Sequence, residues 1–282
     1  MKNKAFEELT IVDDYLFYKV LQDLTICKRL LGHVLKEQIG EIADVEYQKT
    51  IQEGILSKGT RMDVFVRDTR GNVFDVEMQA ANRDNLAKRL RYYQSQIDVF
   101  HLVKGRDYET LPASYIIFFC PFDYPGADLP VYTFRTLCEE QNNIRLQDDA
   151  TKIMINSRAA DKVANAELRA FLEYMNGQKT EDTFVCMIDD RIKSIKNDEV
   201  NRMEYFSWTA KKMDILREGR EEGREEGREE GREEGREEGR EEGREEGRLT
   251  ELRALVTDGL LAADVAAARA GMPVEEFLKS DG

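Results

Sequence analysis

The sequence predicts an α/β fold in which helices flank a mixed sheet of parallel and antiparallel strands. Three observations lead to this prediction. Two adjacent runs between residues 61 and 79 alternate apolar and polar residues with period two, which is typical of strands. A charged helical segment, Ala87–His101, follows them, and the apolar run Tyr115–Cys120 has the composition of a buried strand. Together with the helix and strand predicted before residue 60, these segments give the order helix, three strands, helix and strand.

The chain before residue 60 predicts two helices and a strand. Asp13 or Asp14 can cap the first helix through a side-chain oxygen. Apolar residues then recur at spacings of three and four in two stretches: Leu16, Phe17, Val20, Leu21 and Leu24, followed by Leu30, Leu31, Val34, Leu35 and Ile39. Ile42–Ile51 reads as the first strand, and a loop containing Lys58 leads into the next.

Residues 61–79 predict a β-hairpin whose turn is the Asp-Thr-Arg-Gly-Asn segment. Asp63 lies in the middle of the first strand. On the second strand, Val73, Asp75, Glu77 and Gln79 share one face, while Phe74, Val76 and Met78 share the other. Asp63 and Glu77 are 14 residues apart across the turn. Converging carboxylates of this kind bind a hard divalent cation, although carboxylates on a solvated sheet face are the commoner explanation.

The segments after residue 101 extend the sheet and cover it. Two further strand-like runs lie at residues 129–138 and 151–156. Three helices are predicted over Glu167–Tyr174, Phe184–Lys196 and Asp198–Leu216. We therefore expect a domain over residues 1–216.

A four-residue repeat of Glu, Gly and Arg occupies residues 217–248, with glycine at every fourth position from Gly219 to Gly247. Each interior glycine costs a helix about 1 kcal/mol relative to alanine, whereas a Glu–Arg pair contributes only about 0.2–0.5 kcal/mol. The repeat is either a solvated linker, a self-associating helix whose glycines form one slowly winding stripe, or a site for a specific partner.

A pair of helices, Leu249–Leu261 and Ala262–Leu278, is predicted in the C-terminal segment, residues 249–282. Two short helices resemble a helix-turn-helix, but this segment carries 3 basic and 6 acidic residues, which argues against DNA reading. A docking or oligomerisation module is the better interpretation.

The net charge of −14 argues against an avid non-specific DNA binder, though not against a nuclease. The repeat contributes 9 Arg and 15 Glu to this charge, and residues 1–216 hold 30 basic and 35 acidic residues. Four dispersed cysteines and two histidines give no support to a zinc site or a Cys–His nucleophile. No apolar stretch approaches 18 residues, so we expect a cytoplasmic protein without a membrane span.

Several segments carry a resemblance to a known family. They read VDDYLFYKVLQD, EYQKTI, RMDVFVRD, FDVEMQ, RLRYYQSQID and LRAFLEYMNG, followed by a glycine-rich charged repeat. Together they resemble the PD-(D/E)XK nuclease superfamily, and within it the Rpn family of recombination-promoting nucleases and transposases. The resemblance implies a restriction-endonuclease-like core and cleavage of DNA phosphodiester bonds with Mg²⁺, or alternatively Mn²⁺.

By motif position, the resemblance makes Asp63 and Glu77 metal ligands and places Gln79 where the superfamily usually has lysine. Asp14 and the backbone carbonyl of Met78 are further candidate ligands. Four residues are candidates for contacting the DNA: Lys58, Arg61, Arg89 and Tyr93. Arg89 and Tyr93 lie four residues apart on one helix face.

Three functions remain open from the sequence. The first is a metal-dependent DNA endonuclease in a recombination or mobile-element setting. The second is a catalytically weak protein of the same fold that acts as an assembly or regulatory module through its repeat, which the Gln79 departure and the acidic charge favour. The third is an RNA nuclease.

Overall fold

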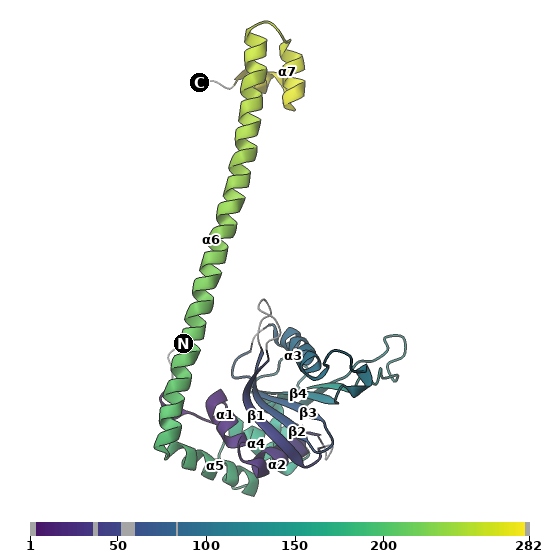
Figure 1. Cartoon of the computed structure of the whole chain (residues 1–282), viewed down its shortest axis with the longest axis vertical. Coiled ribbons are helices and arrows are strands. Elements are labelled where there is room, and N and C mark those ends of the chain that lie inside the picture. Colours follow the sequence, from purple (N-terminus) through teal and green to yellow (C-terminus); the bar gives the residue numbers. More distant parts are fainter. Residues whose placement is uncertain (1–3, 36–38, 52–59, 83, 280–282) are drawn as a thin grey trace. The chain divides into compact units, whose positions relative to one another are not determined.

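The computed structural model describes residues 4–35, 39–51, 60–82 and 84–279 (Figure 1). The chain forms two compact units, Met1–Ser207 and Trp208–Gly282. Lys58 lies outside the described residues, and only the backbone of Arg61 is described.

A six-stranded mixed sheet forms the centre of the first unit, which confirms the predicted fold class. Its strand order is β1-β2-β3-β4-β6-β5. β1, β2 and β3 pair antiparallel, β3, β4 and β6 pair parallel, and β5 returns antiparallel at the far edge. The strands are β1 (Ile42–Ile51), β2 (Thr60–Asp68), β3 (Val73–Met78), β4 (Ser114–Cys120), β5 (Val131–Phe134) and β6 (Ala150–Asn156).

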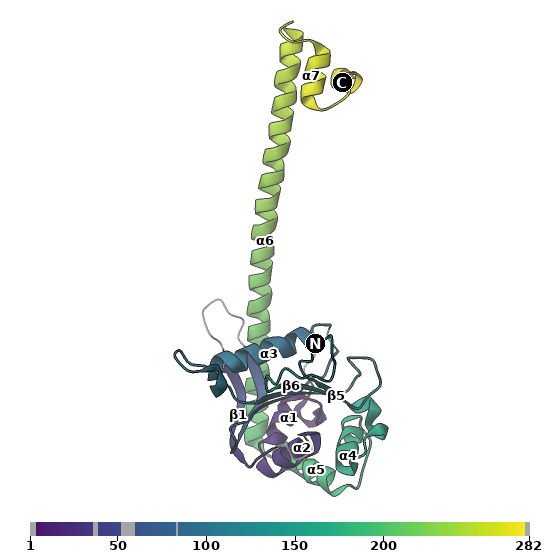
Figure 2. The same ribbon diagram turned by 90° about the vertical axis from the view of Figure 1, so that its right-hand side faces the viewer.

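Helices cover both faces of this sheet (Figure 2). The helix α3 (Leu86–His101) lies alone over one face. Four helices cover the other: α1 (Asp14–Leu21), α2 (Leu24–Leu35), α4 (Ala166–Met175) and α5 (Thr183–Lys196). Short 3₁₀ turns at Phe6–Glu8, Tyr108–Thr110 and Ser157–Lys162 connect these elements. The central strands β3 and β4 are therefore buried on both sides.

The turn between β2 and β3 is fixed by the buried carboxylate of Asp68. Its oxygens accept hydrogen bonds from the backbone N–H of Gly40 at 2.8 Å and from those of Arg70 and Asn72 at 2.9 Å. Gly71 adopts a φ of +85°, a conformation that side chains disfavour. A carboxylate that accepts several backbone N–H groups fixes the turn, and the turn fixes the register of the two strands.

Aromatic side chains fill the core between the sheet and the four-helix face. Phe119 on β4 is fully buried, and its ring lies 5.7 Å from the ring of Phe17 on α1 and 5.7 Å from that of Phe171 on α4. These contacts join three elements that are far apart in the sequence, so the layer depends on the tertiary fold.

The last helix predicted for the domain is longer than expected. It is the helix α6, which spans Glu199–Thr257. The prediction placed its end at Leu216, but the helix continues through the repeat, and the predicted boundaries at 216 and 248 both fall inside it. Its first turns bind α1 within the first unit: the Tyr15 hydroxyl donates to the Asn201 carbonyl at 2.7 Å, and Lys19 pairs with Glu204 at 2.6 Å.

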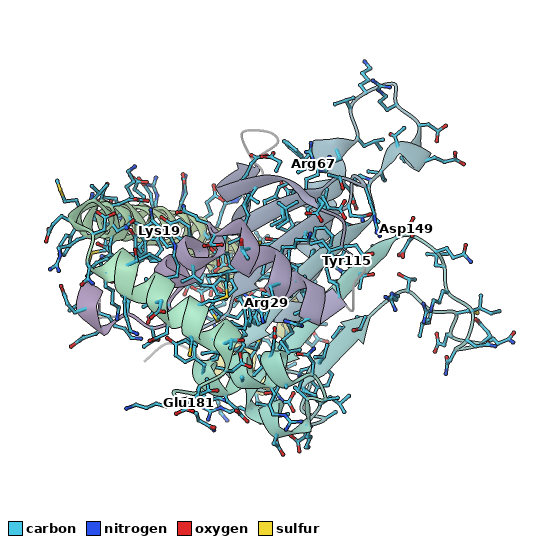
Figure 3. The ribbon with its side chains drawn as sticks, turned by 90° about the horizontal axis from the view of Figure 1, so that it is seen from below. Lys19, Arg29, Arg67, Tyr115, Asp149 and Glu181 are labelled. Carbon is cyan, nitrogen blue, oxygen red and sulfur yellow. The ribbon has the colours of Figure 1, made fainter. Side chains whose placement is uncertain are left out.

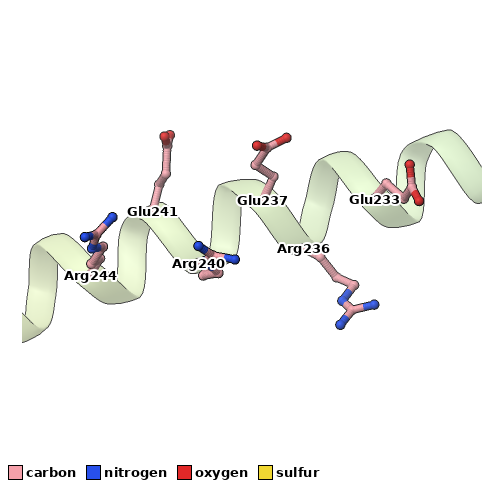
Figure 4. A pocket seen from close by; sticks show the side chains of 6 residues that line it. All are labelled: Glu233, Arg236, Glu237, Arg240, Glu241 and Arg244. Atoms are coloured by element: carbon pink, nitrogen blue, oxygen red, sulfur yellow. The ribbon is translucent and has the colours of Figure 1, made fainter.

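The repeat is helical, and its charged side chains extend outward from the helix (Figure 4). Glutamates 233, 237 and 241 recur at the four-residue spacing, as do arginines 236, 240 and 244. A Cβ added at any repeat glycine would have nothing within 4 Å among the described atoms. The shallow hollow between these side chains lies along one helix and has no apolar residue in its lining.

The C-terminal pair of helices differs from the prediction. The expected helix over residues 249–261 is the end of α6, and residues 262–278 form two helices, α7 (Ala263–Ala270) and α8 (Val274–Lys279). The break lies at Gly271, which adopts a φ of +71°, followed by Pro273. A small core of Leu252, Ala266, Ala267 and Phe277 holds α7 and α8 against the end of α6. No helix in the described ranges is long and apolar enough to cross a membrane.

Replacing Phe119 with alanine should destabilise the first unit. The substitution removes a buried ring from between two others, and such changes cost about 3–5 kcal/mol. Chemical denaturation followed by near-ultraviolet circular dichroism would measure the loss. Tyr108→Ala, at a ring that is 78% exposed, should change the stability by less than about 0.5 kcal/mol. Equal effects of the two substitutions would contradict the assigned core.

Replacing Gly231 and Gly235 with alanine should stabilise the repeat helix by about 1 kcal/mol each, because alanine orders more easily and meets no neighbouring atom. Hydrogen exchange of the repeat, read by mass spectrometry, should become slower. The same substitution at Gly177, which has a φ of +81°, should destabilise its own turn. Unchanged or faster exchange in the repeat would show that its glycines serve something other than an isolated helix.

Candidate active site

The register of β2 and β3 brings three carboxylates onto one face of the sheet. Val64 pairs with Val76 and Phe65 with Asp75 in the antiparallel ladder. The same register, extended by one residue pair beyond Val64 and Val76, places Asp63 opposite Glu77. Side chains directly opposite on antiparallel strands lie about 4.5–5.5 Å apart at Cβ and point to the same side. The face is the one that α3 covers, since the buried cluster there joins Phe65 and Phe118 of the sheet to Leu90 and Tyr93 of α3.

Glu77 is the best-defined carboxylate of this set. Its side chain is 3% exposed. One oxygen, Oε2, accepts a hydrogen bond from the Gln79 amide at 2.9 Å and lies 3.4 Å from Nη2 of Arg89. The other, Oε1, has no hydrogen-bond partner among the described residues. A buried acceptor without a partner is costly and calls for a cation, a proton or a water molecule.

Gln79 and Tyr93 hold the Arg89 guanidinium beside this carboxylate. Nη1 of Arg89 donates to the Gln79 carbonyl oxygen at 2.7 Å, and Nη2 donates to the Tyr93 hydroxyl at 2.9 Å. The guanidinium carbon lies 5.3 Å from the Tyr93 ring centre and 5.6 Å from that of Phe118. Two of the residues predicted to contact DNA, Arg89 and Tyr93, therefore belong to the same cluster as Glu77 and Gln79.

Asp75 belongs to the same site, although it is not among the residues predicted from the sequence. Its side chain is fully buried, and neither carboxylate oxygen has a hydrogen-bond partner among the described residues. The sequence pattern could have predicted that Asp75 belongs to the site, because Asp75 shares a strand face with Glu77 and Gln79. What the sequence lacked was the burial of that face, which α3 provides.

Burial is the main cause of the electrostatics of the site. Desolvation raises the pKa of Asp75 and of Glu77 well above the usual range, and the nearby Asp63 carboxylate raises both further. Arg89 acts in the opposite direction on each pKa. Burial likewise raises the pKa of the Tyr93 hydroxyl. Because Asp75 and Glu77 are buried, they do not lie on a solvated sheet face, so the commoner explanation of these acidic residues is wrong.

Asp14 and the backbone carbonyl of Met78 are the other two predicted ligands. Asp14 is the first residue of α1, and its carboxylate acts on the pKa of Tyr205 at the start of α6. The described charged groups that shift the pKa of Glu77 are Asp63, Asp75 and Arg89. The assignment of Asp14 as a metal ligand therefore stays a prediction. Met78 ends β3 between Glu77 and Gln79.

A broad groove on the opposite face of the sheet does not contain this chemistry. It has a volume of about 1460 Å³ and is lined by α2 and by strands β4, β6 and β5, including Arg29 and Tyr115 (Figure 3). Two of its cations already have carboxylate partners, since Arg29 binds Glu167 and Lys28 binds Glu41. The carboxylate cluster is therefore the better candidate for the active site.

The fold and the carboxylate pair on its hairpin define a nuclease-type protein. The model of the family described as PD-(D/E)XK nuclease family transposase matches residues 12–238. The chain belongs to this family, which confirms the predicted membership. The search of curated proteins and the search of solved structures found no match.

Nucleases of this superfamily generally use divalent metal ions, and the acidic face suits such an ion. Carboxylate oxygens are hard ligands of the kind that Mg²⁺ and Mn²⁺ prefer. The specific observation that fits is that both oxygens of Asp75 and Oε1 of Glu77 have no hydrogen-bond partner among the described residues. Within the described ranges, no three His, Cys, Asp or Glu side chains are already grouped closely enough to hold an ion.

Replacing Asp75 with asparagine should stabilise the protein in the absence of divalent ions. The change removes a buried charge without a partner and should raise the unfolding free energy by about 1–3 kcal/mol. The folded-state pKa is raised, so the native protein loses stability as the pH rises from the ordinary pKa of an aspartate through the raised value. The advantage of Asp75→Asn should thus be largest at neutral and alkaline pH and vanish in acid.

Thermal denaturation at several pH values in EDTA would measure this difference. Asp84→Asn, at an exposed carboxylate just before α3, should leave the melting temperature unchanged throughout the range. A destabilised Asp75→Asn protein would show that the Asp75 carboxylate has a stabilising partner in the native state.

Proposed function

We propose that the protein is a DNA endonuclease that hydrolyses phosphodiester bonds with a divalent metal ion, Mg²⁺ in the first instance and Mn²⁺ as an alternative. One observation carries the proposal. The hairpin places Asp63 opposite Glu77, and the Glu77 carboxylate is buried, has one oxygen without a partner and lies beside a held guanidinium. A buried carboxylate oxygen without a partner among the described residues is uncommon in a structural ion pair and is typical of functional sites.

In this proposal, Asp63 and Glu77 are the principal ligands of the metal ion. Asp14 and the backbone carbonyl of Met78 are further candidates for the coordination shell. A bound divalent ion would polarise the phosphate and lower the pKa of a coordinated water. Gln79 and Arg89 hold the Glu77 carboxylate in position, and α3 lies over that side of the sheet (Figure 2).

The DNA itself would be bound weakly and locally. Arg89 and Tyr93 face the carboxylates from α3, and Lys58 and Arg61 lie in the sequence just before Asp63, where they would meet a phosphate. Residues 1–216 hold more acidic than basic residues, 35 against 30, so few phosphates would be neutralised and the salt dependence of binding should be shallow. Affinity would then come from the metal site and from a partner or second copy.

The repeat helix offers a route to such a second copy. Its glycines recur every four residues and form a stripe without side chains that winds slowly around the helix, which permits close approach of another backbone along that stripe. Its outward glutamates and arginines would pair between two such helices (Figure 4). A homo-oligomer through the repeat fits either a nuclease that acts on two strands or a protein with only an assembly role.

A plasmid-nicking assay separates these functions. The full-length protein should nick supercoiled DNA with Mg²⁺ or Mn²⁺ and not with EDTA. Asp63→Ala and Glu77→Ala should each lower the rate at least ~100-fold, because each removes a carboxylate from the metal site. Glu109→Ala, at an exposed glutamate, is the matched control and should cleave like the wild type.

Two other results would replace the proposal. Absence of nicking with either ion would favour the assembly function, and analytical ultracentrifugation of the full chain would then be the relevant measurement. Cleavage of single-stranded RNA but not of DNA under the same conditions would identify an RNA nuclease.

A further inference from the structure

Resting on the proposed function, we propose that Arg89 supplies the positive charge that a lysine at position 79 would supply, and that Gln79 is the residue that holds Arg89 in place. The cation of the site would thus come from helix α3 and not from strand β3.

The contacts of Gln79 match this role on both sides of its amide. Its nitrogen donates to Oε2 of Glu77 at 2.9 Å, and its oxygen accepts from Nη1 of Arg89 at 2.7 Å. An amide offers both a donor and an acceptor, whereas a lysine ammonium offers donors alone. A lysine at this position would bind Glu77 but would repel the guanidinium. The glutamine is therefore the residue type that an arginine at position 89 requires.

The guanidinium is fixed on its other sides by aromatic residues. It packs against the rings of Tyr93 and Phe118 and donates to the Tyr93 hydroxyl at 2.9 Å. Guanidinium–aromatic contacts of this kind hold a cation in place without neutralising it. A residue that is held from three directions is oriented before any substrate arrives.

Arg89 still has the capacity to bind a phosphate. The contacts to Glu77, Gln79 and Tyr93 use three of the five N–H groups of a guanidinium. The side chain remains 29% exposed, so an oxygen of the substrate can reach it. A planar guanidinium also presents donors in the geometry that a phosphate accepts.

The remaining described cations of α3 do not share this environment. Lys88 and Arg91 are exposed, whereas Arg89 is partly buried and turned toward β3. The burial of Leu86, Leu90, Tyr93 and Ile97 shows which side of the helix faces the sheet. Arg89 lies at the margin of that side, between the core and the solvent.

Exchange of the two positions tests this inference. We would compare plasmid nicking in Mg²⁺ by the full-length wild type, Arg89→Ala, Gln79→Lys and the double variant. Arg89→Ala should cleave at least ~100-fold more slowly, as expected when a charge-stabilising donor is lost. The double variant, which returns a cation to position 79, should recover at least about tenfold over Arg89→Ala. Arg106→Ala, at an exposed arginine beyond α3, should match the wild type.

Binding of Mn²⁺ by titration calorimetry separates a lost charge from a damaged site. Removing a cation beside the carboxylates should leave Mn²⁺ affinity equal or higher in Arg89→Ala, while a collapsed site would lose it. Three results would overturn this inference while leaving the proposed function intact. Arg89→Ala could cleave as fast as an active wild type, it could lose Mn²⁺ binding, or the double variant could be as slow as Arg89→Ala. No cleavage by any protein, wild type included, would reject the proposed function and this inference with it.

Discussion

The packing of α3 over the β2–β3 face is the interaction on which the site depends. Without the helix, Asp75 and Glu77 would lie on an open sheet face, where water would solvate them. With it, both carboxylates are buried, and Arg89 is the described cation that acts on each of them. The same packing removes water, concentrates negative charge and supplies its partial compensation. These three effects together support the proposal that the face binds a divalent cation.

This site lowers the unfolding free energy of the protein. The oxygens of Asp75 and one oxygen of Glu77 lack partners in the described protein, and neighbouring like charges oppose one another. The rest of the first unit offsets this cost through a core that is buried on both faces of β3 and β4 and through the Asp68 turn that fixes the register. Buried carboxylates with strongly raised pKa values are typical of functional sites, which often lower the stability of the fold that contains them.

The repeat helix is not stabilised by tertiary packing in the way the first unit is. Its helix has no described tertiary contact at any glycine, and its stability must come from the helix itself or from another chain. Glycine weakens it at every fourth position, so helix propensity does not explain why the repeat is regular. The first unit, by contrast, obtains its order from contacts between residues more than 100 positions apart, such as Tyr15 with Asn201 and Arg29 with Glu167.

Local pattern in the sequence determined much of this protein by itself. Period-two alternation located β2 and β3, and the positions of Asp63 and Glu77 within these runs placed both carboxylates on a hairpin, because side chains alternate between the two faces along a strand. Three features required the tertiary structure: the burial of Asp75, the contact of Arg89 with Gln79, and the continuation of α6 past Leu216. The first two depend on how α3 packs across the sheet, which no local pattern records. For the third, propensity was a poor guide, because it sums small terms of opposite sign along the repeat.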